Sequence, residues 1–79
     1  MNEDNYVKSR FTLSSIPMVF GFLTQGCVIQ LPSGTYIRMV NKLLYEFDMD
    51  IPIDKYDYPI YFNEDYDISE YQVYIPKVA

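Results

Sequence analysis

The chain has 79 residues, one cysteine, no histidine and a net charge of −5 at pH 7. A chain of this length forms one small domain that buries only about 60% of its unfolded surface, so it is marginally stable by itself. The composition excludes a Ser-His-Asp triad, a Cys-His dyad, a histidine-based zinc site and an internal disulfide, and it favours a reducing compartment, which we expect to be the cytoplasm.

The charges are unevenly distributed along the chain. Residues 1–45 carry four basic and two acidic residues, whereas residues 46–70 carry nine acidic residues and the single base Lys55, for a net charge of −8. An acidic surface repels phosphate and attracts basic protein surfaces, so we expect no direct binding of nucleic acid or of an anionic membrane. The longest apolar run, residues 16–23, is much shorter than the roughly 20 residues that a membrane-spanning helix needs.

The first elements expected along the chain are an edge segment and a short helix. Residues 1–9 are expected to be mobile or to lie at an edge. Ser15 followed by Pro17 is typical of a helix start, and Gly26 is typical of the residue that ends a helix. We therefore predict a short helix between these positions. A buried strand over residues 18–23 is the alternative, because Gly21 disfavours a helix by roughly 1 kcal/mol relative to alanine.

Three strands are predicted over residues 27–47. Residues 27–31 and 35–39 are joined by a Pro-Ser-Gly turn, and a two-residue connection at Asn41 and Lys42 leads into a strand over 43–47. An amphipathic helix competes with this hairpin, because the apolar residues of 36–47 fall in one arc of about 160°. The β-branched residues at 35, 37 and 40 and the unfavourable placement of charges relative to a helix dipole favour the strands. In the strand arrangement, Val40 and Leu44 are expected to face the polar side.

The second half of the chain is expected to be irregular. Residues 48–54 alternate acidic and apolar side chains, and Pro52 indicates an extended edge or a loop. We predict a short strand over 58–62, an acidic turn over 63–70 and a last strand over 71–76. The predicted fold is a single α+β domain over residues 1–79 with one short helix and a three- to five-stranded antiparallel sheet, and an all-β domain is the alternative. The expected core is Phe11, Leu13, Ile16, Val19, Phe20, Leu23, Val28, Ile29, Leu31, Ile37, Met39, Leu43, Phe47 and Val73.

Residues 46–70 form an acidic segment in which tyrosines are interleaved with carboxylates. Tyrosine supplies a large contact area with a polar tip and is enriched at interfaces. In an extended chain, acids two apart lie about 6.7 Å from each other on one face, and the pairs Asp48/Asp50 and Asp65/Asp67 would then match alternate phosphates of a DNA strand. This predicts a DNA-mimicking surface, although acidic residues also serve solubility. The predicted partner-binding residues are Glu46, Asp48, Asp50, Asp54, Tyr56, Asp57, Tyr58, Tyr61, Glu64, Asp65, Tyr66, Asp67 and Glu70.

Other kinds of site are weaker in this sequence. Asn63, Asp65, Asp67 and Ser69 have the 1-3-5-7 spacing of a calcium loop, but Ile68 stands at the glycine position and Tyr74 at the bidentate glutamate position, so at most a weak calcium site is expected. Nothing marks two carboxylates as facing each other across a cleft, so we expect no enzyme, no cofactor and no metal. Cys27 has no neighbouring base and is expected to be a buried, unreactive thiol.

In general character the chain resembles the small acidic proteins of phages and mobile elements, in its short length, acidic charge and many tyrosines. The resemblance is compositional and includes no motif, so no residue role is transferred. That class contains inhibitors of host restriction, CRISPR and DNA-repair proteins. It implies a non-enzymatic inhibitor whose acidic face binds a basic, nucleic-acid-binding site on a host protein. The alternatives are a self-associating structural module, suggested by the uncharged residues 11–37, and a weak calcium-binding module.

Overall fold

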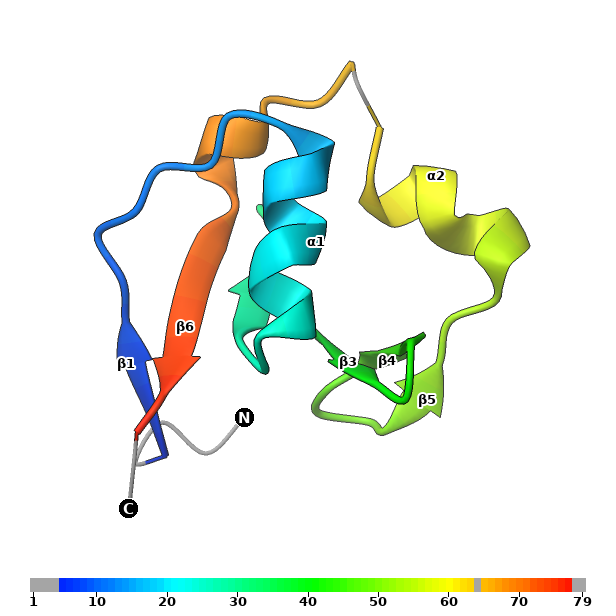
Figure 1. The fold of residues 1–79 in the computed structure, drawn as a ribbon. Helices are drawn as coiled ribbons and strands as arrows, with labels where there is room; N and C mark the ends of the chain where they lie inside the picture. Colours follow the sequence, from blue (N-terminus) through cyan, green and yellow to red (C-terminus); the bar gives the residue numbers. More distant parts are fainter. Residues whose placement is uncertain (1–4, 64, 78–79) are drawn as a thin grey trace.

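Six antiparallel strands and two short α-helices make up the computed structural model, which describes residues 5–63 and 65–77 (Figure 1). The fold is therefore α+β, as predicted, with slightly more strands than expected. The elements in chain order are β1 (Tyr6–Lys8), α1 (Ile16–Thr24), β2 (Val28–Gln30), β3 (Tyr36–Val40), β4 (Leu43–Glu46), β5 (Ile51–Pro52), the 3-10 helix η2 (Lys55–Asp57), α2 (Tyr58–Tyr61), the 3-10 helix η3 (Ile68–Glu70) and β6 (Gln72–Pro76).

The strands lie in the order β1-β6-β2-β3-β4-β5. Strands β2 to β4 form the predicted meander, and the last strand, β6, lies between β1 and β2. Ile29 on β2 stands opposite both Ile37 on β3 and Val73 on β6, so these three buried side chains share one face of the sheet. The edges are the short strands β1 and β5. The predicted edge role of the N-terminal segment is thus confirmed for β1, while residues 1–4 lie outside the described part of the chain.

Helix α1 forms where the sequence predicted it and covers the sheet face that carries Ile29 (Figure 1). The Ser15 hydroxyl accepts a hydrogen bond from the backbone N–H of Met18 at 3.3 Å, which satisfies one of the free donors of the first turn. Gly26 ends the helix with φ +90°, a conformation that favours glycine. The buried-strand alternative for residues 18–23 is wrong.

The β3–β4 connection is a two-residue turn in which Asn41 and Lys42 have φ values of 51° and 67°. Strands, not the competing amphipathic helix, therefore form here. This turn pairs Met39 with Leu44 and Val40 with Leu43. Leu44 consequently lies on the core face and is 0% exposed, whereas Leu43 is 47% exposed. The expectation that Leu44 faces the polar side and Leu43 the core is wrong.

Residues 58–62 do not form the predicted strand. They form helix α2, in which the Phe62 N–H donates to the Tyr58 carbonyl at 2.7 Å. The physical reason is Pro59, which is preset for a first helical turn and has no N–H to give to a strand ladder. Phe62 then enters the core and packs on Phe20, with ring centroids 4.9 Å apart.

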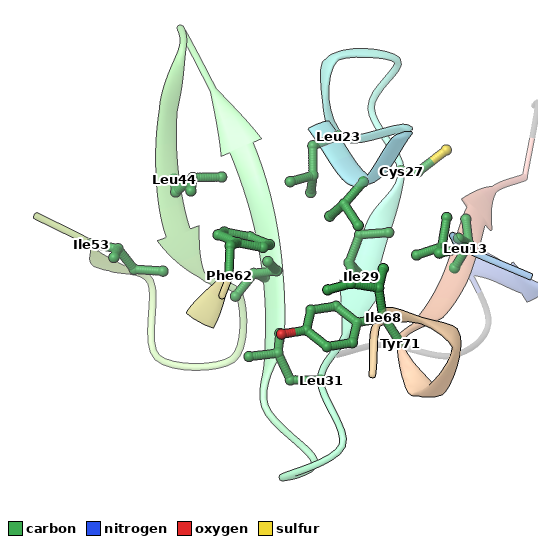
Figure 2. Close-up of a cluster of buried hydrophobic side chains, with 13 residues drawn as sticks. Leu13, Leu23, Cys27, Ile29, Leu31, Leu44, Ile53, Phe62, Ile68 and Tyr71 are labelled. Atoms are coloured by element: carbon green, nitrogen blue, oxygen red, sulfur yellow. The ribbon is translucent and has the colours of Figure 1, made fainter. Parts of the chain in front are cut away.

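The hydrophobic core lies between the sheet, α1, α2 and η3 (Figure 2). Most of the predicted core is buried or half-buried, and Cys27 is buried as expected. The assignment of Phe11 to the core is wrong, because this side chain is 57% exposed and contacts Phe22 at the surface. Leu43 is exposed, as described above, and Phe47 is only half-buried and lies on the other sheet face, so these two predicted core positions are wrong as well. The core side chains that the sequence did not predict are Leu44, Ile53, Phe62, Ile68 and Tyr71.

The sheet face away from α1 carries a second group of aromatic side chains. In a flat sheet, the four strand spacings from β1 to β4 would amount to about 19 Å. Tyr6 on β1 nevertheless contacts Phe47, just after β4, with ring centroids 5.7 Å apart. We infer from this contact that the sheet twists and curves between β1 and β4. The guanidinium of Arg38 lies 4.8 Å from the Phe47 ring centroid, and Val28 on this face is fully buried.

Candidate protein-binding site

The acidic segment, residues 46–70, runs from the end of β4 along one side of the molecule and then across the end at which α1 begins (Figure 1). It includes the edge strand β5, then η2, α2 and η3. Its carboxylates therefore fall into three groups rather than along one continuous strand. Glu64, one of the predicted partner-binding residues, lies outside the described residues.

The first group, at the β4–β5 turn, is largely engaged within the domain. Glu46 is half-buried and accepts a hydrogen bond from the Tyr61 hydroxyl at 2.9 Å. Burial, this hydrogen bond and the negative charges of Glu46 and Asp57 raise the pKa of Tyr61. Asp50 forms an ion pair with Arg38, at 3.4 Å. Glu46 and Asp48 also line a small hollow of about 150 Å³ beside Tyr36 and Met49.

The second group surrounds η2. Asp54 caps this turn, because its Oδ1 accepts a hydrogen bond from the Tyr56 N–H at 2.9 Å. Tyr56 is 92% exposed and Asp57 is exposed. Tyr58 is half-buried and lies near Phe20, with ring centroids 6.5 Å apart. Of the predicted residues here, Asp54, Tyr56 and Asp57 are accessible to a partner.

The third group lines a groove of about 430 Å³, which we call the acidic groove. Asp67 is held at its edge, because its Oδ1 accepts hydrogen bonds from the Ser69 backbone N–H at 3.1 Å and the Ser69 hydroxyl at 2.5 Å. A neighbouring hollow of about 540 Å³ shares Tyr66 and Asp67, so these two residues form the ridge between the hollows. The residues that line the acidic groove are Leu31, Pro32, Ser33, Ile60, Asp65, Tyr66, Asp67, Glu70 and Tyr71.

Strand pairing explains why residues far apart in the sequence meet in the acidic groove. Gln30 on β2 stands opposite Gln72 on β6. Because these strands are antiparallel, the residues that follow β2 lie beside the residues that precede β6. This places Leu31 and the turn at 32–34 next to Glu70 and Tyr71. The Tyr71 hydroxyl donates to the Tyr61 carbonyl and so ties this wall to α2, which contributes Ile60.

Five residues of the acidic groove are not among the partner-binding residues predicted from the sequence. The sequence predicts a strand and core position for Leu31, a turn for Pro32 and Ser33, and strands for Ile60 and Tyr71, so its pattern marks none of them as part of a site. The residues of the β2–β3 turn reach the groove through the pairing of β2 with β6, in which Gln30 stands opposite Gln72, 42 positions further along the chain. The residues missed are Leu31, Pro32, Ser33, Ile60 and Tyr71.

The regular phosphate-like spacing expected of an extended acidic strand is not present. Asp48 and Asp50 lie in the turn at 47–50, where Asp50 has a φ of 52°. Asp65 and Asp67 lie in the turn region before η3. The geometric premise of a strand that matches alternate phosphates is therefore wrong for both pairs. An acidic surface remains, but its carboxylates are not arranged as a ladder.

The calcium-like residues also have local roles. The Asn63 Oδ1 accepts from the Asp65 N–H at 2.9 Å, and Asp67 caps η3. Among the residues that the structure describes, no group of three or more His, Cys, Asp or Glu side chains is placed to hold a metal ion. Nor is any helix within 5–63 and 65–77 long and apolar enough to cross a membrane.

Comparisons of the chain with protein-family models, with curated proteins and with solved structures gave no match.

Proposed function

We propose that this protein is a non-enzymatic inhibitor that uses its acidic segment to occupy a basic, nucleic-acid-binding site on a protein partner in the cytoplasm. The observation that supports the proposal is the acidic groove, where carboxylates, an exposed tyrosine and apolar side chains meet. The groove lies within a segment whose net charge is −8. The compositional resemblance to phage and mobile-element proteins favours an inhibitory role.

The proposed mechanism is competition for a positively charged surface. Complementary charge speeds the encounter and selects basic partners, and the strength of both effects falls as salt is added. Tyr56 and Tyr66 are exposed and would supply contact area once the surfaces meet. Because the carboxylates do not form a ladder, the mechanism requires only that the basic site is covered, not that a DNA backbone is copied atom for atom.

The test is a tagged pull-down from bacterial lysate at low salt, eluted by a salt step and read by mass spectrometry. We expect a nucleic-acid-handling protein that is released by salt and also displaced by added DNA. The variant Asp65→Asn/Glu70→Gln should weaken capture. Its matched control is Asn5→Lys/Gln25→Lys, which changes the net charge by the same amount at exposed positions outside the acidic segment. A partner whose binding ignores salt, DNA and the groove variant would contradict the proposal.

Self-association is the second candidate function. The sheet face away from α1 is not covered by a helix in the described part of the chain, and the neighbouring side chains of Val40 and Leu43 are exposed on it. This candidate predicts a dimer or larger species whose melting temperature rises with protein concentration. Sedimentation equilibrium distinguishes the two candidates, and a monomer at high concentration would eliminate this one.

A further inference from the structure

We infer that the acidic groove is a receptor for one arginine side chain of the protein partner. The inference rests on the proposed function and makes it specific, because it assigns the charged contact to one place in the acidic segment. The occupant is a guanidinium on an apolar stem, and the groove offers a surface for each part.

The apolar part of the groove is unusually open to solvent. Ile60 on α2 is 64% exposed although it is a large aliphatic residue. It lines the same groove as Pro32 from the β2–β3 turn and the buried Leu31. The methylene stem of an arginine would cover such a surface while its charged end stays at the rim. Covering Ile60 removes apolar area from water and so favours binding.

The charged part of the groove is available to a partner. The side chains of Asp65 and Glu70 make no hydrogen bond or ion pair with other described residues, and both are exposed. Glu46 and Asp50, by contrast, are already bound to Tyr61 and Arg38. A cation that enters the acidic groove therefore displaces no existing partner, whereas one at the β4–β5 turn would compete with an internal ion pair.

Arginine fits these groups better than lysine does. A planar guanidinium stacks on an aromatic face such as that of the exposed Tyr66, and it donates two parallel hydrogen bonds to a carboxylate. The lysine ammonium is compact and strongly hydrated, so it gains less from both contacts. Nucleic-acid-binding proteins also use arginine to bind phosphate groups. A basic site of the proposed kind therefore contains exposed arginine side chains.

The experiment is a ¹H-¹⁵N NMR titration of the whole protein at low ionic strength with the peptide acetyl-Gly-Arg-Gly-amide. The matched peptide contains citrulline, which keeps the shape of the arginine side chain and removes its charge. We expect saturable shifts confined to residues 31, 33, 60 and 65–71, which border the groove and carry a backbone N–H. A third peptide, with lysine in place of the arginine, should bind more weakly, and the citrulline peptide should not bind. The variant Asp65→Asn/Glu70→Gln should weaken arginine binding by about tenfold, which corresponds to roughly 1.4 kcal/mol.

Further variants test whether arginine stacks on the ring of Tyr66 and whether it binds in the groove rather than to any acidic surface. Tyr66→Phe keeps the aromatic face and should bind like the wild type, whereas Tyr66→Leu should bind several-fold more weakly. Asp54→Asn/Asp57→Asn removes two charges outside the groove and should leave the groove shifts in place. Shifts spread evenly over all acidic residues would overturn the arginine receptor and leave the proposed function standing. Equal binding of the citrulline peptide would also overturn it, whatever the result of the pull-down.

Discussion

Leu43 and Leu44 are adjacent residues of one type in opposite environments. Leu44 is 0% exposed in the core, whereas Leu43 is 47% exposed on the other sheet face. We expect Leu44→Ala to lower the free energy of unfolding by about 2–5 kcal/mol, and Leu43→Ala by less than about 1 kcal/mol. Urea denaturation followed by circular dichroism measures both. If Leu44→Ala does not fold, Leu44→Val gives a smaller loss of the same sign, and equal losses at the two positions would contradict the register.

Two tyrosine hydroxyls, that of the buried Tyr71 and that of the half-buried Tyr61, make the domain sensitive to alkaline pH. Burial raises the pKa of Tyr71, and burial together with Glu46 raises the pKa of Tyr61. The folded protein therefore retains these protons where the unfolded chain has begun to lose them. This contribution to stability is complete below about pH 10 and is lost as the pH rises through the folded-state pKa values.

We therefore expect the melting temperature of the wild type to fall above about pH 10 more steeply than that of Tyr61→Phe or Tyr71→Phe. Thermal melts at a series of alkaline pH values, each compared with a melt near neutral pH, measure the slope. Tyr56→Phe is the matched control, because this ring is 92% exposed, and it should keep the wild-type slope. A slope that is identical in all four proteins would show that the hydroxyls of Tyr61 and Tyr71 do not contribute.

At the scale of single elements, the β3–β4 turn stores the clearest local strain. Lys42 has a φ of 67°, a left-handed conformation that a side chain disfavours and glycine adopts freely. We expect Lys42→Gly to raise the free energy of unfolding by about 0.5–1 kcal/mol, because Asn-Gly is the preferred sequence of such a turn. Lys42→Ala removes the same charge but retains the strain, so it should give no gain. Chemical denaturation that shows equal stability for the two variants would contradict this account.

The local elements were the part of the fold that could be predicted. Ser15 and Gly26 mark the ends of α1 because caps depend on neighbouring backbone groups. The turn at 32–34 and the turn at Asn41 and Lys42 likewise follow from residue conformation. The prediction of a strand over residues 58–62 was wrong. Their apolar and aromatic composition favours a strand, whereas Pro59 and the packing of Phe62 against Phe20 favour a helix.

At the scale of the whole molecule, Cys27 reports on opening of the core. It is buried, and burial raises the pKa of its thiol, so little reactive thiolate forms at neutral pH. We expect native protein to react with a disulfide reagent far more slowly than denatured protein. Leu44→Ala should accelerate the reaction by about tenfold for each 1.4 kcal/mol of lost stability, if exposure requires global unfolding. Reaction of native protein at the rate of the denatured chain would show that the thiol is accessible in the folded state.

The candidate site was predictable only as a region. The acidic character of residues 46–70 and the exposure of Tyr56 and Tyr66 follow from composition. The partly buried state of Tyr61 and its bond to Glu46 do not, because they depend on where α2 folds back onto β4. The prediction that Asp48 and Asp50 lie on an extended strand was wrong, because Asp50 has a positive φ at which the chain turns.

The sequence by itself determined the charge of the acidic segment, the ends of α1, the two turns and the α+β class, because each depends on residue type or on contacts between close neighbours. Tertiary structure decided which of two adjacent leucines enters the core, and that β6 lies between β1 and β2. It also decided that Ile60, Pro32 and Glu70 share one groove. These outcomes depend on strand register and on packing between distant segments, and such long-range contacts leave no periodic signal in the chain.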